Sequence, residues 1–184
     1  MVNVVAEIIK ALWIILPAYI ANCFPTLTRL FFKKTHPIDF EKYYKGNRIL
    51  GDGKTLEGLL FGLLGGWLIS RIQLSSFMIF NAWFLLNFNQ SIPVISLYAG
   101  LALIFGALIG DMLGSFIKRR LGMVRGQSFL FLDQLTFLVF ALLFAFAFIE
   151  INIWTVIILL LITPIIHRVA NIIGYFLKLK MVPW

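Results

Sequence analysis

The stretch GDMLGSFIKRRLGMVRGQSFLFLDQ, residues 110–134, carries two acids and four bases between long apolar runs. Ionisable side chains are costly inside a bilayer, so they are usually kept at its surface or retained for a function. The acids, Asp111 and Asp133, stand near the two ends of the stretch, and the bases lie between them. This pattern predicts a polar site at one face of a membrane.

The composition of the whole chain agrees with a membrane setting. Of its 184 residues, 61% are hydrophobic, and they are grouped in runs too long for one soluble core of this size. We therefore expect an all-α integral membrane protein with a single transmembrane domain over residues 1–184. Sixteen Lys and Arg outnumber eight Asp and Glu, but they cluster between apolar runs, so they do not indicate nucleic-acid binding. The lone Cys23 excludes an internal disulfide and is expected to be a small buried hydrophobe.

Five apolar runs predict about five transmembrane helices, at residues 4–32, 55–70, 92–113, 133–149 and 153–175. The aromatic segment at residues 74–91 has an apolar part too short to cross a bilayer alone. It is expected to form the end of the second span and an interfacial turn. Polar loops are predicted at residues 33–54 and 114–132.

The distribution of basic residues predicts the orientation of the chain. Thirteen of the sixteen Lys and Arg lie in residues 29–54, in residues 118–125 and in the C-terminal tail. A five-span chain places these three segments on one side, which the positive-inside rule assigns to the cytoplasm. The expected protein is a multi-pass protein of the cell membrane with its N-terminus outside and both polar loops inside.

Two of the predicted spans carry small residues at a spacing of four, which lets helix backbones approach closely. These residues are Gly58, Gly62, Gly66 and Ser70 in one span, and Ala102, Gly106, Gly110 and Gly114 in the other. Packing of the two stripes against each other would bring the start of the second span beside the end of the third. A seam between two copies of the chain is the alternative interpretation.

The first polar loop ends in Gly-Asp-Gly-Lys-Thr, residues 51–55, directly before a predicted helix. Amides at the helix start, the Lys54 amine and the Thr55 hydroxyl would all be available to a phosphate. The segment is not a Walker A motif, because Arg48 stands where that motif needs glycine and no strand precedes it. A glycine turn with Thr55 as helix N-cap explains the same residues equally well.

In the second loop region, Asp111, Ser115 and Lys118 lie at i, i+4 and i+7 and share a helix face, with Arg119 on its flank and Arg120 opposite. An acid, a hydroxyl and a base in line can hold a metal ion and a phosphate together. A basic cluster touching anionic lipid explains the three bases alone. It does not explain an acid at the membrane boundary, where an unpaired carboxylate is expensive.

Asp133 begins the fourth predicted span, where an acid is also a routine helix cap. With Asp111 it would supply two carboxylates from neighbouring helices to a shared divalent metal, as nucleotidyl transfer requires. A further polar patch in the last predicted span comprises Thr163, Pro164, His167, Arg168 and Asn171. It fits either a packing cluster or a port for a lipid phosphate, with His167 in a structural role and Arg168 in a phosphate role.

These motifs resemble a known family. Ser115-x-x-Lys118-Arg119, preceded by Gly110-Asp111, is similar to the signature of the membrane CTP-dependent phosphatidate cytidylyltransferases. With residues 51–55 included, the likeness covers about half of the chain and is strongest to the archaeal branch, the CDP-archaeol synthases.

The chain departs from the bacterial and eukaryotic signature in two places. Gln134 and Leu135 follow Asp133, where that signature continues Arg-x-Asp, and its His-Gly-Gly is reduced to Gly126.

The resemblance implies that the phosphate of 2,3-bis-O-geranylgeranylglycerol 1-phosphate attacks the α-phosphorus of CTP, giving a CDP-activated lipid and pyrophosphate. It implies Mg²⁺ on Asp111 and Asp133, with Lys118 and Arg119 on the phosphates. Binding of CTP is assigned to Asp52, Gly53, Lys54, Thr55, Gly58, Ser115 and Gly126. The lipid phosphate is assigned to Arg125 or Arg168.

A small transporter or scramblase for an anionic solute or lipid is the alternative from another class. Such a protein would be expected to carry ionisable residues deep within several spans. Here they gather at one face, which favours an enzyme that takes one substrate from the cytoplasm and one from the membrane. A CDP-alcohol phosphotransferase would need an array of Asp residues with paired glycine and arginine that this sequence lacks.

Overall fold

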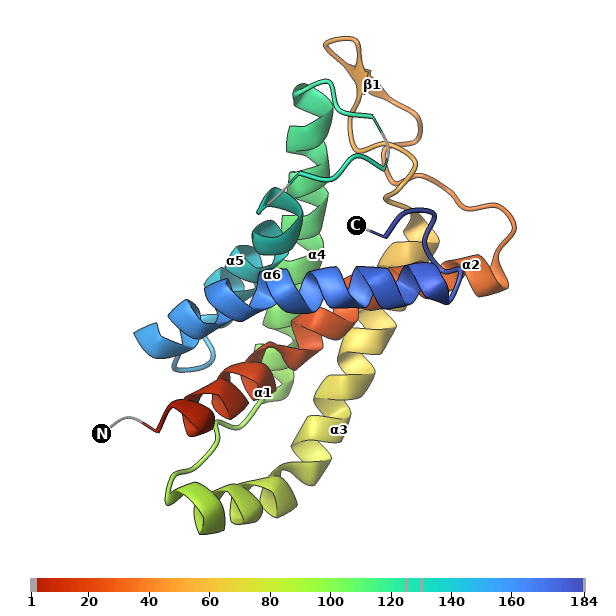
Figure 1. The fold of residues 1–184 in the computed structure, drawn as a ribbon. Helices are drawn as coiled ribbons and strands as arrows, with labels where there is room; N and C mark the ends of the chain where they lie inside the picture. The colour runs from red at the N-terminus through yellow and green to blue at the C-terminus, as the bar shows by residue number, and fades with distance from the viewer. Residues whose placement is uncertain (1–2, 125, 130, 184) are drawn as a thin grey trace.

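The computed structural model describes residues 3–124, 126–129 and 131–183. Helices dominate it (Figure 1), which confirms the predicted all-α class. The main helices are α1 (Val4–Cys23), α3 (Leu56–Phe88), α4 (Leu97–Arg120), α5 (Leu132–Ala145) and α6 (Ile153–Phe176). Shorter elements lie between α1 and α3, namely η1 (Phe24–Leu27), α2 (Thr28–Phe31) and an antiparallel hairpin of β1 (Tyr43–Tyr44) and β2 (Asn47–Arg48).

Four helical segments are long and apolar enough to cross a membrane: α1 continued through α2, then α3, α4 and α6. Helix α5 is apolar but has only 14 residues. It rises about 21 Å, whereas a bilayer core is roughly 30 Å thick. The fourth predicted span is therefore helical but shorter than a membrane crossing. The predicted orientation of the chain stays a prediction.

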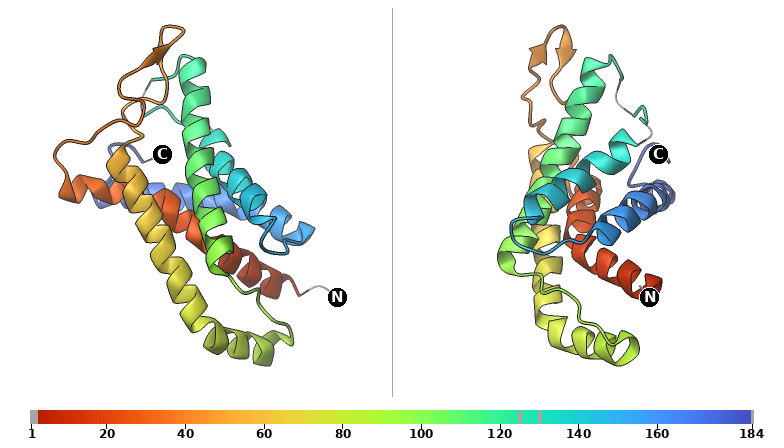
Figure 2. Two further views of the ribbon diagram at one scale, coloured as in Figure 1. Left: turned by 180° about the vertical axis from the view of Figure 1, so that it is seen from behind. Right: turned by 90° about the vertical axis from the view of Figure 1, so that its left-hand side faces the viewer.

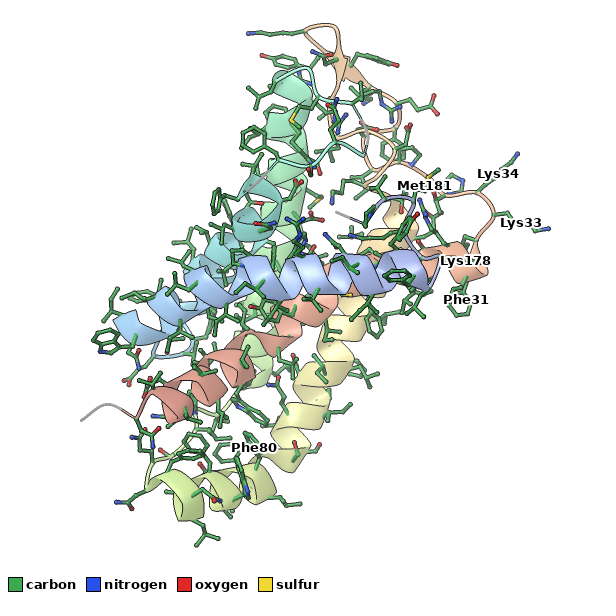
Figure 3. The ribbon with its side chains drawn as sticks, viewed as in Figure 1. Phe31, Lys33, Lys34, Phe80, Lys178 and Met181 are labelled. Atoms are coloured by element: carbon green, nitrogen blue, oxygen red, sulfur yellow. The ribbon has the colours of Figure 1, made fainter. Side chains whose placement is uncertain are left out.

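Most of residues 74–91 form the end of helix α3, as expected, and the predicted turn begins only at Asn89, where the helix ends in a left-handed cap. The helix runs unbroken to Phe88, but its last part bends away from the first, near the labelled Phe80 (Figures 2 and 3). The Ser76 hydroxyl donates to the Ile72 carbonyl at 2.8 Å, and such back-bonding bends helices. Stacking of Phe80 on Trp13 of α1, with ring centroids 4.7 Å apart, holds the bent part in place.

The small residues of α3 allow it to approach both α1 and α4. A Cβ atom at Gly62 would lie 2.7 Å from the Ala21 carbonyl oxygen and 2.8 Å from Leu108 Cδ2. A Cβ atom at Gly66 would lie 2.6 Å from Ile104 Cγ1. These two glycines thus lie beside the middle of α4, and Lys54, just before α3, pairs with Asp111 in the C-terminal half of α4, as the spacing predicted.

The small residues of α4 serve a different contact from the predicted one. A Cβ atom at Gly106 or Gly110 would overlap the backbone of α5, at the carbonyl oxygens of Phe140 and Thr136. The prediction that the two stripes pack against each other is thus wrong for the α4 stripe, because α5 covers that face. This close contact fixes the start of α5 relative to the end of α4.

At the end of the molecule away from the polar loops, a largely buried ion pair joins three parts of the chain. Lys10 Nζ lies 3.2 Å from Glu7 Oε1 and donates to Gln90 Oε1 at 2.6 Å. Asn152 Nδ2 donates to Glu7 Oε2 at 3.2 Å. The pair therefore ties α1 to the α3–α4 connection and to the N-cap of α6.

Replacing Lys10 by Met is expected to lower the free energy of unfolding in detergent by about 3 kcal/mol, because it leaves Glu7 buried without its counter-charge. The double variant Lys10→Met/Glu7→Gln should recover most of this loss, since no isolated charge remains. Thermal unfolding measured for both variants checks the prediction. Equal destabilisation of the single and double variants would contradict it.

Candidate active site

Two ion pairs bring the polar loops together at one end of the helices. Lys54, just before α3, pairs with Asp111 on α4. Lys118, near the end of α4, lies with its Nζ 2.6 Å from Asp133 Oδ1 in the first turn of α5. All four side chains are only partly exposed, so the charges face each other across a half-buried surface. The structure thus gathers both predicted acids and two predicted bases.

The first loop is organised around Asp39, which was not among the predicted site residues. Its side chain is fully buried and accepts from Arg48 Nη2 at 2.7 Å and from the amides of Leu50 and Gly51, each at 2.9 Å. Burial alone would raise the pKa of Asp39, but these hydrogen bonds outweigh burial and hold its pKa well below its ordinary value. The partners lie nine to twelve positions away without regular spacing, so no periodic pattern marks this acid.

The low pKa of Asp39 makes the order of the first loop dependent on pH. The ionised carboxylate stabilises the folded loop at every pH above its ordinary range near 4, and this contribution is lost progressively as the pH falls below that range. The hydrogen-exchange protection factors of the Leu50 and Gly51 amides, which correct for the intrinsic slowing of exchange in acid, are therefore expected to be lower at pH 3 than at pH 7. Asp39→Asn should show the lower protection already at pH 7. Exposed Glu41 offers a matched control, and an equal response of Glu41→Gln would contradict the assignment.

Residues 52–58 contain the N-cap of α3 and, just before it, an open turn. Thr55 is the N-cap of α3, and its Oγ1 accepts from the Gly58 amide at 3.1 Å. That amide is engaged in capping, so the expectation that it is free for a phosphate does not hold in this structure. Asp52, half exposed, pairs with Arg48 Nη1 at 2.8 Å. A Cβ atom at Gly53 would meet nothing within 4 Å, so this turn is open to a ligand.

The end of α4 supports the first loop as well as the site. Arg119 lies beside Gly51, where a Cβ atom would be 3.7 Å from the Arg119 Cδ. Arg120, predicted to point away from Asp111, donates to the backbone carbonyls of Tyr44 and Arg48 and so anchors the hairpin to α4. Arg120 is therefore a structural contact, not a member of a basic cluster on lipid.

The second loop begins later than predicted, because α4 continues to Arg120 where the sequence placed a loop from residue 114. Ser115 is accordingly a buried helical residue. Gly126 adopts a positive φ of 88°, a backbone conformation that favours glycine. Arg125, assigned to the lipid phosphate, lies outside the described residues. Asp133 Oδ2 accepts from the Phe129 amide at 3.0 Å, so this acid also shapes the approach to α5.

A third group of polar residues reaches the site from α6 and the C-terminal tail. Asn171 is buried, donates from Nδ2 to His167 Nδ1 at 3.3 Å, and accepts from Lys180 Nζ. The structural role expected for His167 agrees with this contact. Arg168 is exposed and has no ion pair among the described residues. Cys23, at the end of α1, is also exposed, although a buried side chain was expected. Lys180 carried no sequence signal beyond its charge.

The two acids suit a hard divalent cation. Within the described ranges, no three His, Cys, Asp or Glu side chains form a cluster that could hold a metal ion. A cation at Asp111 and Asp133 would therefore take its remaining ligands from water and substrate. Mg²⁺ is commonly bound in this way, by one or two carboxylates together with substrate phosphates. The donor set thus fits Mg²⁺.

Comparison with known proteins gives consistent matches over nearly the whole chain. The model of the CarS-like family, described as CDP-archaeol synthase, matches residues 1–184. The CDP-archaeol synthase of Pyrococcus horikoshii is 42% identical over 179 residues, which cover 97% of this chain and 98% of that protein. The Methanococcus maripaludis protein of the same name is 43% identical over 177 residues, or 95% of this chain and 96% of that protein.

A solved structure described as an intramembrane enzyme for archaeal membrane lipid biosynthesis has a similar fold. It superposes with a TM-score of 0.70 at 33% identity and covers 90% of this chain and 94% of that chain. Its description agrees with the long apolar helices seen here.

Proposed function

Because the chain belongs to the CDP-archaeol synthase family, we propose that it couples CTP to 2,3-bis-O-geranylgeranylglycerol 1-phosphate and releases pyrophosphate. Membership of this family makes it a CTP-dependent cytidylyltransferase of archaeal lipid biosynthesis and an intramembrane enzyme. One observation carries the finer proposal: the pairs Lys54–Asp111 and Lys118–Asp133 gather acids and bases from three parts of the chain at one end of the helices. We place this end at the cytoplasmic face of the cell membrane.

The bases that lie where the two loops meet would bind the triphosphate. An ammonium group has three donors, so Lys54 and Lys118 can each keep a carboxylate contact and still bind a phosphate oxygen. Arg119 presents a planar fork suited to phosphate, and its Nε is buried without a hydrogen-bond partner in the described part of the chain. The open turn at Gly53 leaves room for the nucleotide beside these bases.

In the reaction, an oxygen of the lipid phosphate forms a bond to the α-phosphorus of CTP. The bond from that phosphorus to the bridging oxygen of the β-phosphate breaks, and pyrophosphate leaves with its electron pair. A phosphate monoester is already mostly ionised at pH 7, so no side chain has to act as general base. The bases of the site neutralise charge and hold the two phosphates in line.

Asp111 and Asp133 would hold Mg²⁺, which when bound supplies further neutralisation of the phosphate charge. Their pairing with lysines holds both carboxylates in position before the substrates arrive. The chain therefore presents two oxygen ligands and three bases on the same half-buried surface.

The direct test supplies purified protein with labelled CTP, Mg²⁺ and the isoprenoid glycerol phosphate. Labelled CDP-lipid and pyrophosphate are expected in equal amounts. Parallel reactions with diacylglycerol phosphate and undecaprenyl phosphate measure the preference for the lipid. Absence of labelled lipid with all three acceptors would refute the proposal.

A further inference from the structure

The C-terminal tail folds back onto the site. After α6, the amides of Leu179 and Lys180 both donate to the Gly174 carbonyl, at 2.8 and 3.1 Å, and Lys178 adopts a positive φ of 58°. Figure 1 shows the tail turning back from the end of α6 towards the polar loops. This reversal directs the Lys180 stem along Gly174 and its ammonium group towards Asn171.

The Lys180 ammonium is largely withdrawn from water but lacks a counter-ion. Its Nζ donates to Asn171 Oδ1, and no carboxylate lies within ion-pair distance of it among the described residues. Burial lowers the pKa of Lys180, and coulombic interaction with Cys23, Asp111 and Asp133 only partly opposes this effect. Because an ammonium group has three donors, two remain for an anion, which would also offset the cost of burial.

Lys180 differs in this respect from the other lysines of the site. Lys54 and Lys118 each hold an acid, whereas Lys180 is held by the neutral amide of Asn171. The charges of Asp111, Lys54 and Asp133 act on Lys180, so it lies close to the same group of acids and bases. It is thus placed to meet a second phosphate, not the one bound by the loops.

The surroundings of Lys180 indicate from where that phosphate comes. Phe176, Leu177 and Met181 are strongly exposed apolar residues on either side of it. Figure 3 shows Met181 and Phe31 at the same end of the molecule, together with the exposed bases Lys33, Lys34 and Lys178. An anion that reaches Lys180 past this apolar surface is one attached to hydrocarbon chains, whereas the nucleotide enters beside the polar loops.

We propose that Lys180, oriented by the buried Asn171, binds the phosphate of the isoprenoid substrate and holds it against the CTP site. This inference rests on the proposed function and deepens it. It replaces the earlier assignment to Arg168, which is exposed and has no polar partner among the described residues. The two polar loops would then bind the phosphates of the nucleotide, and the C-terminal tail would bind the phosphate of the lipid.

The test compares Lys180→Met, Lys180→Arg and the control Lys178→Met, which removes an exposed lysine of the same tail. For Lys180→Met, the KM for the lipid phosphate should rise roughly 10- to 100-fold, as expected for loss of a charged hydrogen bond. Its KM for CTP should change less than about twofold, well under the effect of one hydrogen bond. Lys180→Arg should restore much of the lipid affinity, and Lys178→Met should match the parent.

A binding assay without CTP separates this inference from the proposed reaction. In nanodiscs, Lys180→Met should weaken binding of the isoprenoid glycerol phosphate and leave binding of the uncharged isoprenoid glycerol unchanged. If the parent makes no CDP-lipid but shows this difference, the reaction is wrong and the phosphate site stands. A raised KM for CTP alone, or unchanged lipid binding in a folded Lys180→Met protein, would overturn the inference.

Discussion

Asn at position 111 or 133 is expected to lower kcat by about a thousandfold, the upper range for removal of one preorganised electrostatic group. Each substitution keeps the shape of the side chain but removes an oxygen ligand for Mg²⁺ and the counter-charge of a lysine. Turnover measured with saturating CTP and lipid checks the prediction. Glu150→Gln, an acid-to-amide change at an exposed turn, should leave turnover unaffected.

A role for Asp111 in holding metal can be separated from a role in placing Lys54. If the acid only positions the lysine, Asp111→Asn and Lys54→Met should cost equal amounts, and the double variant should cost no more than either. If it also binds Mg²⁺, Asp111→Asn should cost more and should raise the Mg²⁺ concentration needed for half-maximal rate. Turnover near the parent rate in either Asn variant would remove that acid from the site.

The parts of this molecule that the sequence predicted are those determined by local patterns. Apolar runs predicted the long helices, and the i, i+4, i+7 spacing predicted that Asp111 and Lys118 share a face of α4. Both acids of the predicted site do meet bases from another part of the chain. The shortness of α5 and the end of α3 at Phe88 were not predicted, because hydrophobicity alone does not mark where a helix ends.

The missed site residues depend on contacts that no local pattern records. Asp39 is defined by donors nine to twelve residues away in an irregular loop. Lys180 looks like an ordinary basic tail residue until the chain reverses after α6 and carries it back to Asn171. The packing of α4 on α5 was missed for a related reason, since a stripe of small residues shows that a helix is approached but not by which partner.

That packing makes Gly110→Ala the substitution with the largest expected effect on the fold near the site. The added Cβ atom would overlap the Thr136 carbonyl oxygen and lie 2.8 Å from Phe137 Cα. Because backbone atoms cannot rotate away, α5 has to shift, at a cost of about 1–3 kcal/mol in unfolding free energy. The shift also moves Asp133 relative to Asp111, and displacements of about 1 Å at a reacting centre can reduce turnover roughly a hundredfold.

Gly114→Ala, one helical turn further along the same face of α4, provides the matched comparison. There the added Cβ atom would lie 2.8 Å from Thr136 Oγ1, a hydroxyl that can rotate away at the expense of its hydrogen bond to the Leu132 carbonyl. Its losses of melting temperature and turnover should therefore be smaller than those of Gly110→Ala. If both variants keep the parent melting temperature and turnover, the close contact of α4 with α5 does not set the distance between the two acids. If only Gly110→Ala loses melting temperature and turnover, the lack of a side chain at Gly110, beside Asp111, sets that distance.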